Sequence, residues 1–143
     1  MTTPLTGSCL CGAIRYTVSA PITELRACHC LDCQKASGTG ASVNAVIPSA
    51  AFAITQGVPK RYEAKAASGR ILYRHFCADC GSPIYSQRQT TPETVTIRVG
   101  TLDDPPPARI TTHIWTKRAR PWSWIDPAAA QHPGQPDAPA TAR

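Results

Sequence analysis

The chain has 143 residues, a formal charge of +6 at neutral pH and 42% hydrophobic residues. This length suits a single domain that buries a core of its own, so the fold need not depend on cross-links. The longest mainly apolar stretch, residues 41–54, is interrupted by polar residues and proline. It falls short of the roughly 20 apolar residues of a membrane-spanning helix, which excludes a helical membrane protein.

The composition also argues against secretion and against nucleic acid as the partner. The first seven residues contain neither a basic nor an apolar region, and an odd number of cysteines, seven, is not a disulfide framework. We therefore expect a cytoplasmic protein in a reducing compartment. Seven thiolates and two zinc ions would lower the charge to about +3. The densest basic cluster, residues 117–120, is too short to predict a nucleic-acid surface.

Short alternating segments predict a mainly β fold with one or two short helical turns. The clearest alternation is that of Val95, Ile97 and Val99. Residues 24–29 are expected to be extended, and residues 31–36 to form a helical turn closed by Gly38. From Pro127 the chain is rich in Pro and Ala, so we expect one zinc-binding domain over residues 1–126 and a disordered tail over residues 127–143. Strands are predicted at residues 13–18, 43–47, 52–55, 60–63, 71–76, 83–86, 94–100 and 110–115.

Four of the cysteines occur as two close pairs, each followed by glycine. The pairs are Cys9 with Cys11 and Cys77 with Cys80. Two pairs supply the four ligands of a closed tetrahedral zinc site, so we expect a structural zinc that ties distant segments together. The alternative is that these thiols pack as small apolar side chains.

The other three cysteines, Cys28, Cys30 and Cys33, lie within six residues. Three thiolate ligands leave one position of a zinc ion open, which is typical of a metal that acts on a substrate. Such a centre favours thiol chemistry, because zinc promotes deprotonation of an incoming thiol. Two alternatives remain: an unidentified fourth protein ligand would make a second structural zinc, and a metal-free set of thiols would be a redox sensor. His29 is expected to point away from its cysteine neighbours.

The cysteine segments resemble those of the glutathione-dependent formaldehyde-activating enzyme family, which also includes centromere protein V. The resemblance rests on residues 7–12, Cys28-His29-Cys30 with Cys33, Ser37-Gly38, and residues 76–82. It implies a zinc-stapled β-tent fold of small antiparallel sheets. It also implies a structural zinc at the two cysteine pairs and a reactive zinc at Cys28, Cys30 and Cys33. The family's activity joins glutathione to formaldehyde and is classed as that of a carbon–sulfur lyase.

We therefore interpret the chain as an enzyme that forms or breaks thiol–aldehyde adducts, with S-hydroxymethylglutathione as the adduct that the resemblance implies. Its partners would be a small thiol such as glutathione and a small aldehyde, with two Zn²⁺ ions per chain. The second ion is expected to exchange more easily, so partial occupancy is expected. The alternative function is a non-catalytic zinc-organised module that binds protein or nucleic acid. His75, His113 and the aromatic residues are interpreted as packing residues.

Overall fold

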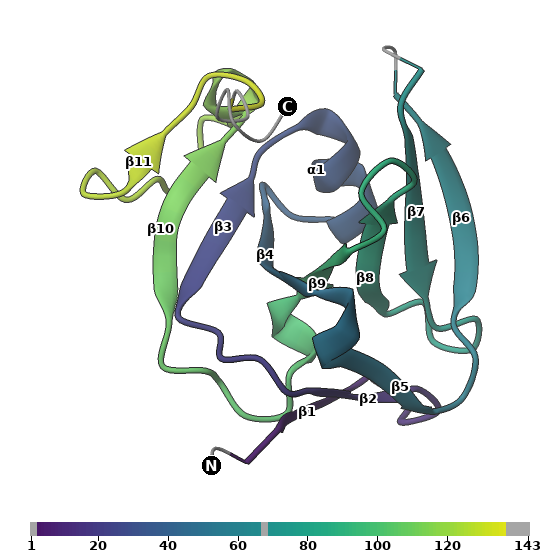
Figure 1. Ribbon diagram of the computed structural model, residues 1–143. Coiled ribbons are helices and arrows are strands. Elements are labelled where there is room, and N and C mark those ends of the chain that lie inside the picture. The colour runs from purple at the N-terminus through teal and green to yellow at the C-terminus, as the bar shows by residue number, and fades with distance from the viewer. Residues whose placement is uncertain (1–2, 67–68, 137–143) are drawn as a thin grey trace. The chain divides into compact units, whose positions relative to one another are not determined.

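The computed structural model describes residues 3–66 and 69–136 of the chain (Figure 1). The backbone forms two compact parts, Met1–Thr23 with Asn44–Ala108, and Glu24–Val43 with Arg109–Arg143. Both parts are built mainly from strands, which confirms the predicted mainly β class.

The first part contains a three-stranded antiparallel sheet in the order β1-β2-β5 (Figure 1). Tyr16 and Val18 of β2 are each 1% exposed, as their alternation with polar residues predicts. The Tyr16 ring lies against Phe52 of β5, with 5.3 Å between ring centroids. Strand β1 was not predicted, because it lacks an alternating apolar pattern. The strands span β1 (Leu5–Ser8), β2 (Arg15–Val18) and β5 (Phe52–Gln56).

The first part also contains an antiparallel run of strands in the order β4-β9-β8-β7-β6. These strands confirm the predicted segments, with one difference in β9. The alternation from Val95 to Val99 predicted a strand to residue 100, but β9 ends at Arg98 and a 3₁₀ helix, η2 (Val99–Thr101), follows. The strands span β4 (Ser42–Pro48), β6 (Lys60–Lys65), β7 (Ile71–Phe76), β8 (Pro83–Arg88) and β9 (Thr94–Arg98), with η1 (Ser49–Ala51) after β4.

In the second part, three strands pair in the order β11-β10-β3, and both pairings are parallel. Parallel neighbours need a long connection, and about 80 residues separate β3 from β10. Sequence patterns do not reveal such a pairing. The elements are β3 (Glu24–Cys28), α1 (Leu31–Ser37), β10 (Arg109–Ile114), η3 (Thr116–Arg118) and β11 (Ala130–Gln131).

The segment from Pro127 differs from the expected disordered tail over its described length. The backbone N–H of Trp115 donates to the Gly134 carbonyl at 3.2 Å, and that of Thr116 donates to the His132 carbonyl at 3.0 Å. The His132 N–H in turn donates to the His113 carbonyl at 2.9 Å. Backbone pairing of this kind does not require apolar side chains, so composition gave no sign of it. Residues 137–143 of the predicted tail lie outside the described residues, and the domain boundary at residue 126 stays a prediction.

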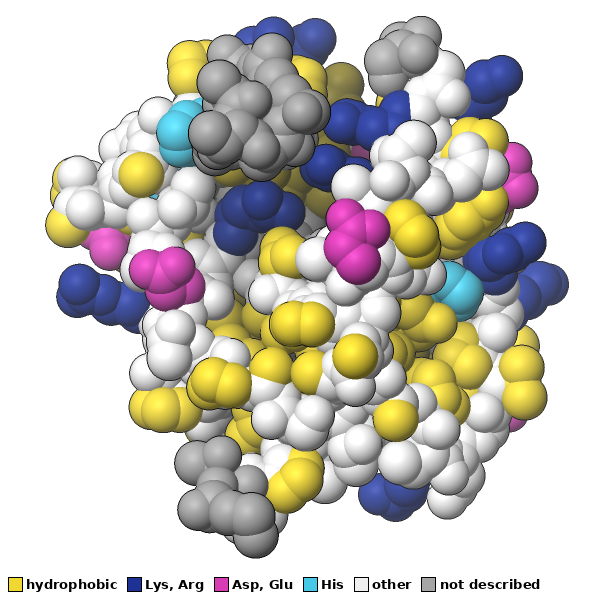
Figure 2. All heavy atoms as spheres, viewed as in Figure 1, with side chains coloured by type: hydrophobic (Ala, Val, Ile, Leu, Met, Phe, Trp, Pro, Cys, Tyr) yellow, Lys and Arg dark blue, Asp and Glu magenta, His cyan; other side chains and the backbone are white. Residues whose placement is uncertain are grey.

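The surface carries apolar side chains between polar ones (Figure 2). Among the large hydrophobic residues, Leu10 is 88% exposed and Val58 is 87% exposed, and both lie outside the named helices and strands. Isolated apolar side chains of this kind are normal on a protein surface. In the described residues, no helix has the length and apolar character needed to cross a membrane.

We predict that Gly7→Ala destabilises the first part by about 1–3 kcal/mol, the usual cost of overpacking a core. A Cβ atom at Gly7 would overlap the ring of Tyr16, and that ring is held by a 2.7 Å hydrogen bond to Thr101. Urea unfolding measures the change. Gly100→Ala is the matched control, since no atom lies within 4 Å of the Cβ that it would add. Equal stability of the two variants would contradict the prediction.

We predict that the contribution of Asp103 to the stability of the fold depends on pH. Its carboxylate accepts hydrogen bonds from Ser8 and Thr6, both at 2.7 Å, and these bonds lower its pKa. The stabilisation is therefore present above the unfolded-state pKa of about 3.9 and is lost as the pH falls through the folded-state pKa. The urea midpoint of the wild type should exceed that of Asp103→Asn at neutral pH, and the gap should close below about pH 4. Asp104→Asn, at the exposed neighbouring position, should show no such gap.

Candidate metal centres

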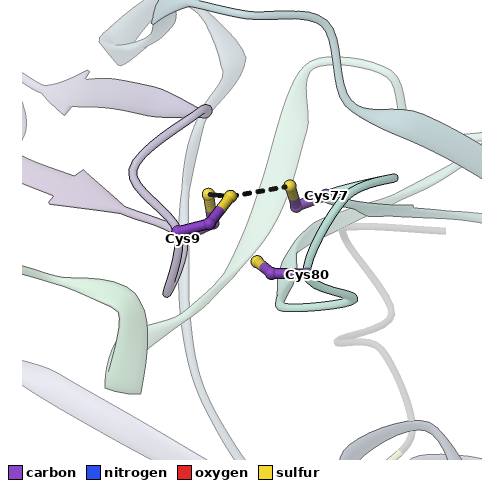
Figure 3. Close-up of side chains that lie close together, drawn as sticks. Cys9, Cys77 and Cys80 are labelled. Carbon is purple, nitrogen blue, oxygen red and sulfur yellow. Dashed lines mark hydrogen bonds between the residues drawn. The ribbon is translucent and has the colours of Figure 1, made fainter.

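The first cysteine group joins two turns of the first part of the chain. Cys9 and Cys11 follow β1, and Cys77 and Cys80 follow β7. Figure 3 shows the sulfur atoms of Cys9, Cys77 and Cys80 directed toward one another. All four Sγ atoms lie within 4.8 Å of one another, with 3.6 Å between Cys9 and Cys11 and 3.7 Å between Cys11 and Cys77. The structure thus brings together the two pairs that the sequence assigned to one site.

The sulfur spacing fits a tetrahedral metal ion. Zinc–sulfur bonds of about 2.3 Å place the sulfurs of a regular tetrahedron roughly 3.8 Å apart. The observed separations are close to this value and far longer than a disulfide bond of about 2.05 Å. All four cysteines are free, and the donor set is entirely soft thiol, which suits zinc.

Two glycines shape the turns that carry these cysteines. Gly12 has φ +78° and Gly81 has φ +79°, a region that side chains with a Cβ rarely enter. The Gly12 N–H donates to the Cys9 carbonyl at 3.1 Å, and the Gly81 N–H donates to the Cys77 carbonyl at 2.8 Å. Each turn therefore folds back on its first cysteine and directs two sulfurs to the same side.

Ser82 supports this group and was missed at the sequence level. Its hydroxyl accepts the Leu10 N–H at 3.0 Å and lies 3.2 Å from the Cys80 sulfur. The hydroxyl and the backbone N–H of Ser82 lower the pKa of Cys80 to about 5. Ser82 thus connects the two cysteine turns and stabilises a thiolate in one of them. Ser82 belongs to the segment of residues 76–82 that carries the family resemblance, but the spacing alone does not indicate a hydrogen bond between its hydroxyl and the other cysteine turn.

The second cysteine group belongs to the second part of the chain. Cys28 ends β3, Cys30 caps the N-terminus of α1, and Cys33 lies in its first turn. The Cys33 N–H donates to the Cys30 sulfur at 3.3 Å, so the capping bond itself draws two of the thiols together. All three sulfurs lie within 4.8 Å of one another. The sulfurs of Cys30 and Cys33 and the burial of the site raise the pKa of Cys28.

Within its own part of the chain, over the described residues, no fourth Cys, His, Asp or Glu donor joins this group. The surroundings are apolar: Cys28, Cys33 and Ile114 form a buried cluster, and Trp115 packs against it. Trp115 has φ +58°, a strained conformation for a residue with a large side chain. Its packing role agrees with the interpretation from sequence. The surrounding contacts must maintain this conformation, which places Trp115 against the cluster that contains two of the thiols.

His29 lies between two of these cysteines, and its ring contacts His113. The His29 Nε2 and His113 Nδ1 atoms are 2.9 Å apart, and each residue is 1% exposed. Burial lowers the pKa of both imidazoles, so both are neutral. The Asp126 N–H donates to His113 Nε2 at 3.2 Å, so the proton of His113 is on Nδ1 and is donated to His29. This bond fixes the direction of the segment that carries Cys28 and Cys30.

Gln34 connects α1 to the segment after β10. Its amide nitrogen donates to the His29 carbonyl at 2.7 Å and to the Arg118 carbonyl at 2.9 Å. Its amide oxygen accepts from Arg120 Nε at 2.6 Å. Gln34 is 8% exposed, so its bond to the His29 carbonyl is shielded from water. Arg120, from the basic cluster of residues 117–120, therefore has a structural role in this part.

These observations define a class: a mainly β protein with two separate cysteine groups that could hold metal ions. The sequence model of the family described as "Glutathione-dependent formaldehyde-activating enzyme" matches residues 4–118. The chain belongs to this family. A Halomonas elongata protein named "Putative glutathione-dependent formaldehyde-activating enzyme" is 28% identical over 129 residues, which cover 85% of this chain and 81% of that protein.

A solved structure supports the fold. The crystal structure of a Rhodobacter sphaeroides protein superposes with a TM-score of 0.58 at 23% sequence identity. The match covers 71% of this chain and 91% of that one. At this level of identity the likeness concerns the fold alone.

We predict that Gln34→Met loosens the segment at residues 118–120. Methionine keeps a similar length but neither donates nor accepts the amide hydrogen bonds, which leaves the buried His29 carbonyl and the Arg118 carbonyl without this partner, at about 1–3 kcal/mol. Hydrogen exchange should rise in residues 116–123, and urea should unfold the variant earlier. Lys35→Met is the control, since Lys35 is exposed on the same helix. Unchanged exchange in the Gln34 variant would show that these bonds contribute nothing.

Proposed function

We propose that this protein is a zinc enzyme that forms or breaks adducts between a small thiol and an aldehyde, with glutathione and formaldehyde as the pair. In this proposal Cys9, Cys11, Cys77 and Cys80 hold a structural zinc. Four convergent sulfurs at near-tetrahedral spacing support that assignment. A metal there would tie together turns 66 residues apart and so stabilise the fold against unfolding.

The working zinc is assigned to Cys28, Cys30 and Cys33. The observation that carries the proposal is that three sulfurs converge in an apolar setting without a fourth protein donor from their own part of the chain. A three-ligand site leaves a position for a substrate atom. The description of the matched family supports glutathione as the thiol and formaldehyde as the aldehyde.

A zinc ion bound by three thiolates supplies positive charge that lowers the pKa of a substrate thiol. In the reaction, the thiol sulfur forms a bond to the aldehyde carbon and the carbonyl π bond breaks. The proton lost by the thiol ends on the new hydroxyl group, and the reverse reaction is the lyase direction. Atoms and electrons balance without a further reactant.

The protein's own residues prepare the site for this reaction. Trp115 and Ile114 keep water from the sulfurs, which favours a carbon–sulfur bond over hydration of the aldehyde. The His29–His113 bond holds the segment that contains Cys28 and Cys30. Gln34 fixes α1, which carries Cys33, to the same part of the chain. A cytoplasmic location is part of the same proposal, since a reducing compartment keeps the thiols free.

We predict that Cys30→Ser and Cys80→Ser have different consequences. Serine still caps α1, so Cys30→Ser should remain folded while it loses about one of two zinc ions and at least roughly tenfold in adduct formation. Cys80→Ser should lose the other zinc and much of the protein's thermal stability, because structural zinc contributes about 10–16 kcal/mol in small peptides. Zinc per chain is measured by elemental analysis, and the adduct by NMR with labelled formaldehyde after subtraction of the uncatalysed reaction.

The same pair of variants separates an enzyme from a zinc-organised binding module. If both zinc ions are structural, Cys30→Ser should unfold as readily as Cys80→Ser. If the wild type with two zinc ions forms adduct no faster than buffer, the enzymatic proposal is wrong. If no zinc is bound at Cys28, Cys30 and Cys33, the redox-sensor interpretation of these thiols gains support.

A further inference from the structure

Arg120 is an exposed arginine whose guanidinium group is held in place by α1. Its Nε donates to the amide oxygen of Gln34 at 2.6 Å, and its side chain makes no other hydrogen bond or ion pair with the described residues. The Gln34 amide is itself fixed, because its nitrogen donates to the His29 carbonyl at 2.7 Å and to the Arg118 carbonyl at 2.9 Å. The Nε edge of the guanidinium is thus occupied, while its two Nη groups remain available for a ligand.

The backbone that carries Arg120 forms a tight turn against the loop after α1. The Ser123 N–H donates to the Arg120 carbonyl at 2.9 Å, and Pro121 stands at the second position of this turn, where its restricted φ is favoured. A Cβ atom at Gly40 would overlap the Ser123 hydroxyl and the Trp122 ring, so the turn lies directly against that loop. The turn is therefore fixed in the middle of α1 and again beyond its C-terminus.

Gln34 also connects Arg120 to the cysteines that are proposed to hold the working zinc. It follows Cys33 directly in α1, and its amide nitrogen bonds to the carbonyl of the residue between Cys28 and Cys30. The guanidinium is thus two side-chain hydrogen bonds away from the backbone of the cysteine segment, and all of these residues belong to one compact part of the chain. A tripeptide thiol can bridge such a separation, since an extended residue reaches about 3.3–3.6 Å.

No acidic side chain among the described residues of this part neutralises Arg120. Glu24 lies opposite Arg109 at the start of β3, the end of the strand away from Cys28. Asp126 accepts a backbone N–H two residues later in the chain at 2.9 Å. Asp32 lies about 200° around α1 from Gln34, on another side of the helix. Over residues 24–43 and 109–136 the acidic residues are these three, and the basic ones are Arg26, Lys35, Arg109, Lys117, Arg118 and Arg120.

We propose that Arg120 binds a carboxylate group of the small thiol substrate and so determines which thiols the protein accepts. The inference rests on the proposed function for the identity of the ligand, since glutathione carries two carboxylates. The two Nη groups of a guanidinium match the two oxygens of a carboxylate with parallel hydrogen bonds. Because Gln34 already holds the Nε edge, little side-chain freedom is lost on binding. Arg120 is the residue that touches the substrate, and Gln34 is its positioning residue.

The probe for this site is S-methylglutathione, which keeps both carboxylates but has no thiol to bind a metal. Calorimetry with the zinc-loaded protein should show binding that weakens as salt rises. Arg120→Met keeps the apolar stem but removes the charge and the donors, and it should weaken binding by about tenfold.

Arg109→Met is the matched control, because it removes the same charge from the same part of the chain. Arg109 lies opposite Glu24, whereas Ile114 at the other end of β10 lies opposite Cys28. Five residues of strand separate the two ends by roughly 16 Å. Charges at this separation are largely screened at physiological salt, so the control should change binding of the probe by less than about twofold.

Turnover gives a readout that a merely structural role of Arg120 would not produce. Arg120→Met should raise KM for glutathione more than it lowers kcat. For cysteamine, a thiol without a carboxylate, kcat/KM should change by less than about twofold. An equal loss for both thiols overturns the proposal, because Arg120 would then support the zinc centre without recognising a carboxylate.

A second measurement on the wild type keeps the test decisive if Arg120→Met fails to fold. S-Methylglutathione diethyl ester lacks both carboxylates and should bind about tenfold more weakly than the free acid. Equal affinity for ester and acid overturns the proposal, and so does equal binding by folded Arg120→Met and the wild type. The absence of saturable binding to the wild type at millimolar concentrations overturns it as well. Displacement of the probe by acetate at the probe's own concentration also overturns it, because the turn would then be a general anion patch.

The failure of this inference can be told from the failure of the proposed function. Arg120-dependent binding of the probe without any adduct formation by the wild type would retain the carboxylate site and reject the activity. Adduct formation with probe binding that does not depend on Arg120 would retain the activity and reject the carboxylate site.

Discussion

The convergence of four cysteine sulfurs from two distant turns is the constraint on which the first part of the structure depends. Cys11 and Cys77 are 66 positions apart and their sulfurs are 3.7 Å apart. Strands β2 to β7 and helix α1 lie between these residues in the sequence, so the ends of this long segment must meet. Four thiolates in such proximity repel one another, and a divalent cation relieves that repulsion. Under the proposed zinc assignment, metal binding and folding of this part are one equilibrium.

The second cysteine group is local in sequence and is held in a different way. Its three sulfurs come from one strand end and one helical turn, and the helix cap itself brings Cys30 and Cys33 together. Hydrogen bonds from His113 to the His29 ring and from Gln34 to the His29 carbonyl hold the surrounding segment, and Trp115 packs against the cluster that contains Cys28 and Cys33. The geometry of this group is therefore set by protein contacts as well as by any metal. A centre that must exchange a substrate benefits from such support, because its ligands stay in place when the fourth position is empty.

The sequence was informative where a feature depends on local spacing. Alternation predicted most strands, and close cysteine spacing predicted both groups, since each pair or triplet lies within a few residues. Features that join distant segments were not predictable. His29 and His113 are 84 positions apart, and the parallel pairing of β3 with β10 leaves no local pattern. The pairing of β11 with β10 uses backbone groups, which every residue has, so a segment rich in Pro and Ala gave no sign of it.

Charge sets a requirement on the zinc centre proposed for Cys28, Cys30 and Cys33. Three thiolates and one zinc ion carry a net charge of −1, and a substrate thiolate brings the centre to −2. Under the proposed function, this negative charge disfavours the approach of the two carboxylates of glutathione, although the open zinc position binds its thiol. Cations must compensate, and they must not compete for the sulfurs. Arginine meets both conditions, because it stays protonated and does not ligate zinc. Arg120 lies in the same part of the chain as these cysteines, where its Nε donates to the amide oxygen of Gln34 in α1.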